Sequence, residues 1–201
     1  MRAVIFDMDG VLCHYELDKR LAALSHLSGR APAEIERAIW GSGFEEDADS
    51  GVYASGDAYL QAFAERLGHP IRRAEWIAAR RASMTPIPEV LSLAAAIRAT
   101  ATVALLSNNG PLTQETFPEL FPEAAALFGH AVFFSWSFGI KKPEPEIYRR
   151  TARFLDVSPD NAVFIDDKAH NVAGAEAAGL TAFRFSTAGQ LRKDLAAARV
   201  L

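Results

Sequence analysis

The chain has 201 residues, of which 50% are hydrophobic and 23% are charged, and its formal net charge is −4 at pH 7. This apolar content excludes an intrinsically disordered chain, and the length suits one catalytic domain that carries a small insertion. The net negative charge excludes nucleic-acid binding as the main function, because affinity for a phosphate backbone depends on concentrated Lys and Arg.

The first predicted element is an apolar strand at about residues 3–7, which leads into two aspartates. Asp7 and Asp9 are two positions apart, so on an extended segment their side chains point to the same side. Gly10 then lets the backbone turn away. Two carboxylates about 4 Å apart repel each other by roughly 4 kcal/mol at an effective dielectric constant near 20, which favours a divalent cation between them. An isolated Asp-x-Asp-Gly sequence is equally typical of a simple turn.

The residues before Asp7 are too few for a signal peptide, and no apolar run approaches the roughly 20 residues of a membrane span. The single cysteine, Cys13, excludes an intrachain disulfide framework and a cysteine-based zinc site, and we interpret it as a small buried hydrophobe. We therefore expect a cytoplasmic protein that has no contact with membranes.

A long segment with helical periodicity follows the first strand. The predicted helices lie at about residues 17–27, 33–40, 57–67 and 74–83, with glycines between them. We expect residues 14–85 to form a small helical cap that is connected to the rest of the chain at residues 13–16 and 84–88. The arginine pairs at positions 72–73 and 80–81 are interpreted as parts of a solvated face.

After the predicted cap, helices and strands alternate. A helix extends to about residue 99, strands are expected near 102–106, 131–135, 162–166 and 181–185, and further helices begin near Pro111, Pro145 and Lys168. This alternation predicts a parallel sheet with helices on both faces. The fold class is therefore α/β, with a Rossmann-like core built from residues 1–13 and 86–201. Ligands of such sheets bind at the carboxyl ends of the strands.

Three further groups of polar residues lie at the ends of predicted elements. They are Ser107-Asn108-Asn109 after one strand, Lys141-Lys142 before Pro143, and Asp166-Asp167 after another strand. With the segment around Asp7, these four segments resemble the four motifs of the haloacid dehalogenase (HAD) superfamily. The resemblance extends from Asp7 to the helix after Asp167, and it is closest to the branch of sugar-phosphate phosphatases and epoxide-hydrolase N-terminal phosphatases. Members of this kind carry a helical cap inserted just after the first strand.

The resemblance implies an enzyme, a Mg²⁺-dependent phosphatase that acts on a small phosphorylated metabolite such as a hexose phosphate. Asp7 is then the nucleophile that forms an aspartyl-phosphate, and Asp9 is the general acid and base. Asp9 favours phosphoryl transfer, since members that resemble the dehalogenases proper lack the second aspartate. Lys142 would place a cation against Asp7 and the phosphate. Lys141 competes for that role, although the resemblance places the functional lysine directly before the proline.

The predicted cofactor is Mg²⁺, which suits a site made of a few carboxylates, waters and a substrate phosphate. Its expected ligands are Asp7, the backbone carbonyl of Asp9 and Asp167, with Asp166 as a second carboxylate in or near the coordination sphere. Adjacent residues on a strand point in opposite directions, so which of Asp166 and Asp167 binds directly depends on where the strand ends. The resemblance favours Asp167.

Substrate binding is assigned to two regions. Ser107 and Asn108 precede a helix whose first turn contains Pro111, and the free N–H groups of that turn suit a phosphoryl group. In the cap, Phe44 and Tyr53 are expected to contact the substrate, because a loop of related phosphatases resembles residues 44–56. Trp40, Glu45 and His14 are weaker candidates of the same kind.

Two alternatives to a phosphatase stay open. A phosphosugar mutase of the same superfamily would share this core, but such mutases carry a histidine in the first cap linker, and here the nearest ones are His14 and His26. A binding module with an inactive site is disfavoured because every expected functional group is present. A Schiff-base mechanism, as in phosphonate hydrolases, would depend on Lys19 and is disfavoured, since a single lysine in an amphipathic helix is usually solvated.

Overall fold

The computed structural model describes residues 2–200 and contains a five-stranded parallel sheet with the strand order β5-β4-β1-β6-β7. The strands are β1 (Ala3–Phe6), β4 (Thr102–Ser107), β5 (Val132–Phe134), β6 (Ala162–Asp166) and β7 (Thr181–Arg184). Phe6 lies opposite Leu105 of β4 and Ile165 of β6. The carboxyl ends of three neighbouring strands therefore lie together in the middle of the sheet. This confirms the predicted α/β fold class.

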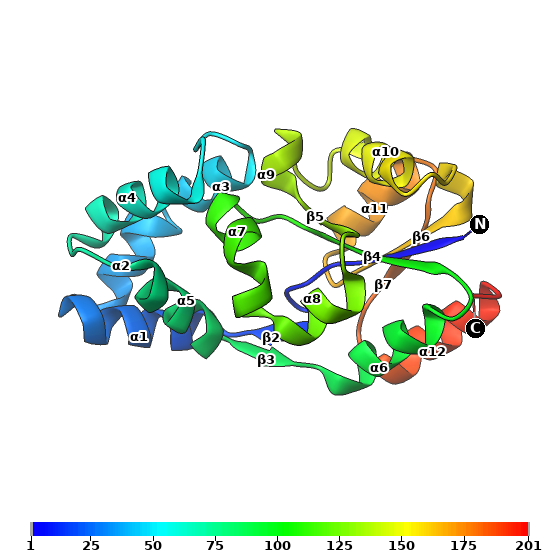
Figure 1. The fold of residues 1–201 in the computed structure, drawn as a ribbon, viewed down its shortest axis with the longest axis horizontal. Helices are drawn as coiled ribbons and strands as arrows, with labels where there is room; N and C mark the ends of the chain where they lie inside the picture. The colour runs from blue at the N-terminus through cyan, green and yellow to red at the C-terminus, as the bar shows by residue number, and fades with distance from the viewer. Residues whose placement is uncertain (1, 201) are drawn as a thin grey trace.

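Side chains alternate between the two faces of the sheet, and each face is covered by helices. Phe6 packs on the face covered by α6 (Pro88–Ile97) and α12 (Ala188–Ala197). Ile5 packs on the opposite face, covered by α10 (Pro145–Phe154) and α11 (Ala169–Ala177). Figure 1 shows these two helix layers above and below the strands. The strands are thus buried on both sides, and only their ends are available for a site.

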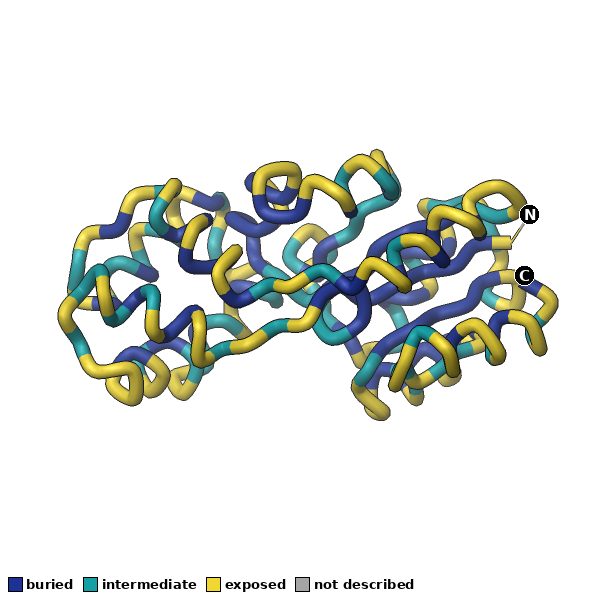
Figure 2. Tube along the Cα trace, turned by 90° about the horizontal axis from the view of Figure 1, so that it is seen from below, coloured by how far each residue is buried: buried dark blue, intermediate teal, exposed yellow. Residues whose placement is uncertain are grey.

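A second group of helices lies at the other end of the molecule from the chain termini (Figure 1). These helices, which we call the cap, are α1 (Leu17–Ser28), α2 (Pro32–Ile39), α3 (Phe44–Asp49), α4 (Gly56–Leu67) and α5 (Arg73–Ala82). They share an apolar core of their own, which includes Phe44, Tyr59, Phe63 and Trp76. Figure 2 shows buried segments both in the cap and along the strands. Two short antiparallel strands, β2 (Cys13–Tyr15) and β3 (Met84–Pro86), join the cap to the sheet. The exact limits of the cap, which the sequence predicts at residues 14 and 85, stay a prediction.

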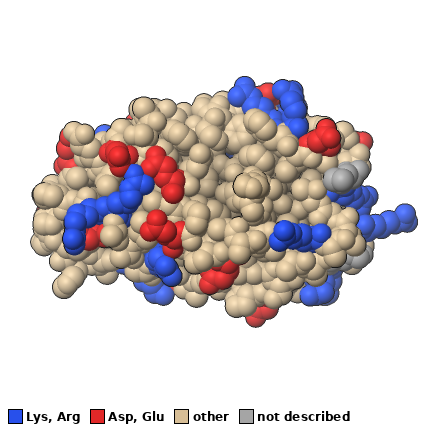
Figure 3. Space-filling model, in the orientation of Figure 1, with Lys and Arg blue, Asp and Glu red and all other residues tan. Residues whose placement is uncertain are grey.

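One helix outside the cap packs against it. α7 (Pro111–Leu120) contributes Leu112 and Leu120 to the apolar core of the cap. Its Glu115 accepts a hydrogen bond from the backbone N–H of Gly56 at 2.7 Å and pairs with Arg73 at 2.8 Å. On the face shown in Figure 3, basic and acidic side chains are interspersed over the cap. The cap is therefore anchored to α7 by apolar packing and by ion pairs.

Several short elements have no counterpart among the predicted ones. They are α3, α8 (Pro122–Phe128), α9 (Ser135–Phe138), the 3₁₀ helix η1 (Pro159–Asn161) and the longer α12. The elements of three to seven residues among them span too few turns for helical periodicity to identify them. Within the described residues, no helix is long and apolar enough to cross a membrane. Cys13 is fully buried, as expected.

Candidate active site

Three carboxylates meet where β1 and β6 end. Asp7, Asp166 and Asp167 each offer one oxygen atom, and these atoms lie within 4.8 Å of one another. The chain continues the sheet ladder as far as Asp7, whose backbone N–H donates to the carbonyl of Ile165 at 2.9 Å. Asp7 and Asp166 are almost fully buried. Because the strands are adjacent and parallel, residues far apart in the sequence form one acidic cluster.

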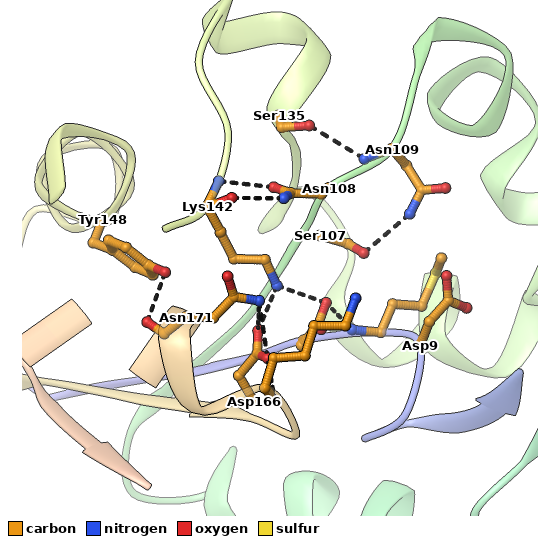
Figure 4. A network of polar contacts seen from close by, with 12 residues as sticks. Asp9, Ser107, Asn108, Asn109, Ser135, Lys142, Tyr148, Asp166 and Asn171 are labelled. Atoms are coloured by element: carbon orange, nitrogen blue, oxygen red, sulfur yellow. Dashed lines mark hydrogen bonds and ion pairs between the residues drawn. The ribbon is translucent and has the colours of Figure 1, made fainter. Parts of the chain in front are cut away.

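A buried lysine bridges two of these carboxylates. The Nζ of Lys142 lies 2.8 Å from Asp7 Oδ1 and 2.7 Å from Asp166 Oδ2. The side-chain amide of Asn108 holds the backbone of Lys142, since Nδ2 donates to its carbonyl and Oδ1 accepts from its N–H, both at 2.9 Å (Figure 4). Of the two lysines before Pro143, Lys142 is therefore the one that lies at the acidic cluster. Lys141 is half-buried. Asn108 therefore positions the cation, a role that was not predicted for it.

The charges of the cluster perturb one another. Burial raises the pKa of Asp7 to about 7, against the lowering effect of Lys142, and the negative charge of Asp166 adds to the rise. Burial acts in the same direction on Asp166, but Lys142 and the N–H donors around it hold the pKa of this carboxyl below its usual range. One lysine therefore neutralises only part of the negative charge, and the cluster favours an additional cation.

The two neighbouring aspartates of β6 differ in their surroundings. Asp166 accepts from Lys142, from the backbone N–H of Lys168 at 2.9 Å and from Asn171 Nδ2, which lies 3.0 Å from both oxygens. The backbone carbonyl of Asn171 in turn accepts a hydrogen bond from the hydroxyl of Tyr148 (Figure 4). In contrast, Asp167 Oδ1 is buried and has no hydrogen-bond partner among the described residues. A buried acceptor without a donor is costly, so Asp167 is the carboxylate that suits a cation.

Gly10 makes room for Asp167. Its φ of +89° is unfavourable for any residue with a side chain. A Cβ atom at this position would lie 2.7 Å from the carboxyl carbon of Asp167, much closer than side chains pack. The sequence indicates Gly10 as a turn residue. The structure shows a second reason for a glycine here, because the carboxyl group of Asp167 lies where a side chain would begin.

A small cavity adjoins the acidic cluster. It has a volume of about 50 Å³, and its walls are formed by Asp7, Asp9, Ser107, Asn108, Lys142, Lys168 and Asn171. A water molecule needs roughly 10–15 Å³ by this measure, so the cavity has room for a group of a few heavy atoms. Ser107 Oγ is fixed by Asn109 Nδ2 at 3.0 Å, and the backbone N–H of Asn109 donates to Ser135 Oγ at 3.2 Å (Figure 4).

The cap contributes one side chain that the sequence interpretation placed wrongly. Arg80 was assigned to a solvated face, but it is only 3% exposed, and its Nη2 lies 2.6 Å from Asp9 Oδ2. Its partner in the pair, Arg81, is exposed as expected. Arg80 lies one helical turn after Trp76 and Ile77, which are buried on the same helix. That spacing was the available signal, because residues four apart on a helix share a face.

The aromatic residues that were predicted to contact substrate lie in the cap. Phe44 is fully buried in the cap core, where its ring centroid is 5.1 Å from those of both Tyr53 and Tyr59. The guanidinium of Arg66 lies 4.3 Å from the centre of the Phe44 ring. Phe44 and Tyr53 therefore pack against each other in the cap, and a contact of either residue with substrate stays a prediction. The apolar cap needs a core, and that core takes up its aromatic residues.

Asp49, at the end of α3, was not predicted as a site residue. Burial raises its pKa to about 8, and the negative charge of Glu45 adds to the shift. Asp49 also interacts electrostatically with Lys141, Arg80 and Asp9, which places it at the boundary between the cap and the sheet. No pattern in the sequence indicated this, since α3 is a six-residue helix with four acidic residues.

Comparisons with known proteins identify the family and the fold of the chain. A family model described as haloacid dehalogenase-like hydrolase matches residues 1–179. A phosphatase of Mycobacterium tuberculosis is 28% identical over 201 residues, which cover 94% of this chain and 89% of that protein. A D-ribitol-5-phosphate phosphatase of Bacteroides thetaiotaomicron is 24% identical, with 97% of each chain covered. A solved HAD family enzyme of the same bacterium, in complex with magnesium and inorganic phosphate, shares the fold with a TM-score of 0.78 at 19% identity, covering 92% of this chain and 94% of that one.

Proposed function

The chain belongs to the haloacid dehalogenase-like hydrolases, and we propose that it is a Mg²⁺-dependent phosphatase acting on small phosphate monoesters through an aspartyl-phosphate on Asp7. The observation that carries the proposal is the buried cluster of Asp7, Asp166 and Asp167 around Lys142, next to a cavity large enough for a phosphoryl group. The two phosphatases among its relatives support the same reaction class.

The residues at the cluster fit a magnesium ion. All donors are oxygen atoms, as Mg²⁺ prefers. Asp167 has a buried oxygen without a partner, whereas both oxygens of Asp166 already accept hydrogen bonds. We assign Asp7, Asp167 and the backbone carbonyl of Asp9 as the residues that would hold the ion, with Asp166 acting on Lys142. When bound, the ion supplies positive charge next to the phosphoryl oxygens.

In the first half-reaction, an oxygen of Asp7 attacks the phosphorus atom. The bond between phosphorus and the ester oxygen breaks, and Asp9 gives its proton to the departing alkoxide. Lys142 reduces the repulsion between the carboxylate and the phosphate dianion. Ser107 and Asn108 line the cavity in which the transferring group would lie. The phosphoryl group is then covalently bound to Asp7.

In the second half-reaction, Asp9 accepts a proton from a water molecule. The water oxygen attacks phosphorus, the bond between phosphorus and Asp7 breaks, and inorganic phosphate leaves. Asp7 returns to its carboxylate form, and Asp9 holds the proton that the next leaving group requires. The same carboxyl group thus acts in both directions, which requires that it face both the cavity and the cap.

The size of the cavity and the relatives support a substrate class. The cavity takes up the phosphoryl group, so the leaving group has to lie on the cap side of Asp9. A small polar leaving group such as a sugar or polyol is the proposed class, and a D-ribitol-5-phosphate phosphatase among the relatives supports it. A phosphosugar mutase, which would return the phosphoryl group to a second hydroxyl, is the alternative within the same family.

Release of inorganic phosphate from a panel of small esters, including hexose 1- and 6-phosphates, tests the proposal. We expect release with Mg²⁺, none with EDTA, and loss of activity in Asp7→Asn. Asp160→Asn, an exposed aspartate in η1, is the matched control and should keep full activity. Interconversion of hexose phosphates without release would support the mutase. Release that survives in Asp7→Asn would refute the mechanism.

A further inference from the structure

Arg80 is the buried cation of the cap that reaches the site. It is 3% exposed, and its Nη2 lies 2.6 Å from Asp9 Oδ2 and 3.4 Å from Asn109 Oδ1. Its guanidinium carbon lies 4.4 Å from the centre of the Tyr15 ring. Its Nε is buried and has no hydrogen-bond partner among residues 2–200. A buried guanidinium is costly unless it is paired, so the ion pair with Asp9 is what holds Arg80 in this position.

The position of Arg80 is also well determined from the side of the cap. It lies in the last turn of α5, whose end is fixed by Ser83, since both the hydroxyl and the N–H of Ser83 donate to the carbonyl of Arg80 at 2.6 and 3.1 Å. β3 follows directly and pairs with β2, which contains Tyr15. One connected unit therefore holds Arg80, and it consists of the end of α5, the ring of Tyr15 and the paired strands β2 and β3.

Asp9 has few other contacts that could orient its side chain. Its Oδ1 accepts only from the thiol of Cys13 at 3.6 Å, and a thiol is a weak donor. Arg80 therefore makes the one strong contact to the carboxyl group of Asp9 that the structure shows among residues 2–200. Asp9 belongs to the loop after β1, whereas Arg80 belongs to the cap, so the contact exists only when the cap is seated on the sheet.

We infer that Arg80 is a positioning residue that acts through Asp9, holding this carboxyl group against the oxygen atom of the leaving group once the cap is seated. The inference rests on the proposed function. It goes beyond that function because it makes protonation of the leaving group dependent on a side chain of the cap. Arg80 transfers no proton itself and acts on the reaction only through the carboxyl group of Asp9. A phosphate ester with a poor leaving group depends on this contact, whereas one with a good leaving group does not.

The test compares two kinds of substrate. p-Nitrophenyl phosphate releases a phenolate that needs no proton, while an alkyl phosphate releases an alkoxide that does. The quantity to measure is kcat/KM, because it covers the steps only up to departure of the leaving group. Arg80→Met removes the charge but keeps apolar volume, and Arg80→Lys keeps the charge. The control is Arg81→Met, since Arg81 also connects the cap to α7, through the carbonyl of Glu119 at 3.0 Å.

In Arg80→Met we expect kcat/KM for the alkyl ester to fall roughly 10- to 100-fold more than kcat/KM for the aryl ester, which is part of the roughly 100- to 10,000-fold that general acid catalysis supplies. Arg80→Lys should recover part of that difference, and Arg81→Met should leave the ratio of the two substrates unchanged. Arg80→Lys keeps the test decisive if Arg80→Met does not fold, because a correctly folded lysine variant should still show a selective loss for the alkyl ester.

Equal losses for both substrates in Arg80→Met and Arg80→Lys would overturn the inference and leave Arg80 with a structural role only. This outcome is distinct from failure of the proposed function. A wild-type protein that releases phosphate from neither ester refutes the phosphatase, and the role of Arg80 with it. An active wild-type protein whose selectivity does not change in the Arg80 variants refutes the positioning role alone.

Discussion

The loss of stability that follows replacement of Lys142 by methionine can be worked out from distances in the structure. The Nζ of Lys142 lies 2.8 Å from one buried carboxylate and 2.7 Å from another. At an effective dielectric constant near 20, each attraction amounts to about 6 kcal/mol. Desolvation of the three buried charges offsets a large part of this sum, and removal of one partner from a buried ion pair costs about 3–5 kcal/mol. Methionine keeps the apolar volume, so the loss is electrostatic.

The expected result is a lower thermal stability of Lys142→Met in EDTA. For a chain of this length, 1 kcal/mol corresponds to roughly 2–4 °C in Tm, so the midpoint should fall by about 6–20 °C. Added Mg²⁺ should restore more stability in the variant than in the wild-type protein, because the ion then replaces the lysine charge that Asp7 and Asp166 have lost. Catalytic activity should fall as well, since Asp7 and the phosphate lose their screening charge.

Thermal unfolding with EDTA and with Mg²⁺ measures both effects. Lys193→Met is the control, since Lys193 is an exposed lysine on α12, and its Tm should change little. A Tm of Lys142→Met in EDTA that equals the wild-type value would contradict the reasoning. It would mean that the two carboxylates are already neutral or solvated in the folded protein.

Three further predictions concern the metal site and the cap. Gly10→Ala should weaken Mg²⁺ binding at least tenfold by calorimetry, because its Cβ would displace the carboxyl group of Asp167; an unchanged affinity would show that Asp167 is not a ligand. Mg²⁺ affinity should rise between pH 6 and 8, since a proton competes for Asp7, whose pKa is raised to about 7, and a flat profile would argue against Asp7 as a ligand. Phe44→Ala should lower the free energy of unfolding by about 3–5 kcal/mol, because its ring is fully buried in the cap core. Equilibrium denaturation measures this last effect, and an altered substrate preference at unchanged stability would instead favour the original assignment of Phe44 to the substrate.

Local patterns in the sequence were sufficient to predict the parallel sheet. The apolar runs before Asp7, Ser107 and Asp166 are long enough to identify buried strands, and their alternation with helices requires parallel pairing. Because parallel strands end at one edge, the four motifs had to lie near one another, and the structure brings Asp7, Lys142, Asp166 and Asp167 together. The strands, their parallel pairing and the meeting of the motifs depend only on periodicity and chain direction, and both can be read from the sequence.

Other features depend on contacts between residues that are far apart in the chain. An arginine in an amphipathic helix is by default solvated, and only the packing of α5 against the loop after β1 buries Arg80 and pairs it with Asp9. Aromatic residues of the cap could equally have faced a substrate, but the cap needs an apolar core of its own, and Phe44 fills it. The difference between Asp166 and Asp167 likewise depends in part on a distant donor, because Lys142 adds to the donors that Lys168 and Asn171 provide just after β6.

Periodicity along the chain was sufficient to predict the fold class and the run of helices after the first strand, and the residue types at strand ends predicted the acidic cluster. Which carboxylate keeps a free oxygen, which arginine is buried and which aromatic residues form a core depends on tertiary contacts. The physical reason is that burial and pairing are properties of the space between segments, and neighbours in that space are not neighbours in the chain.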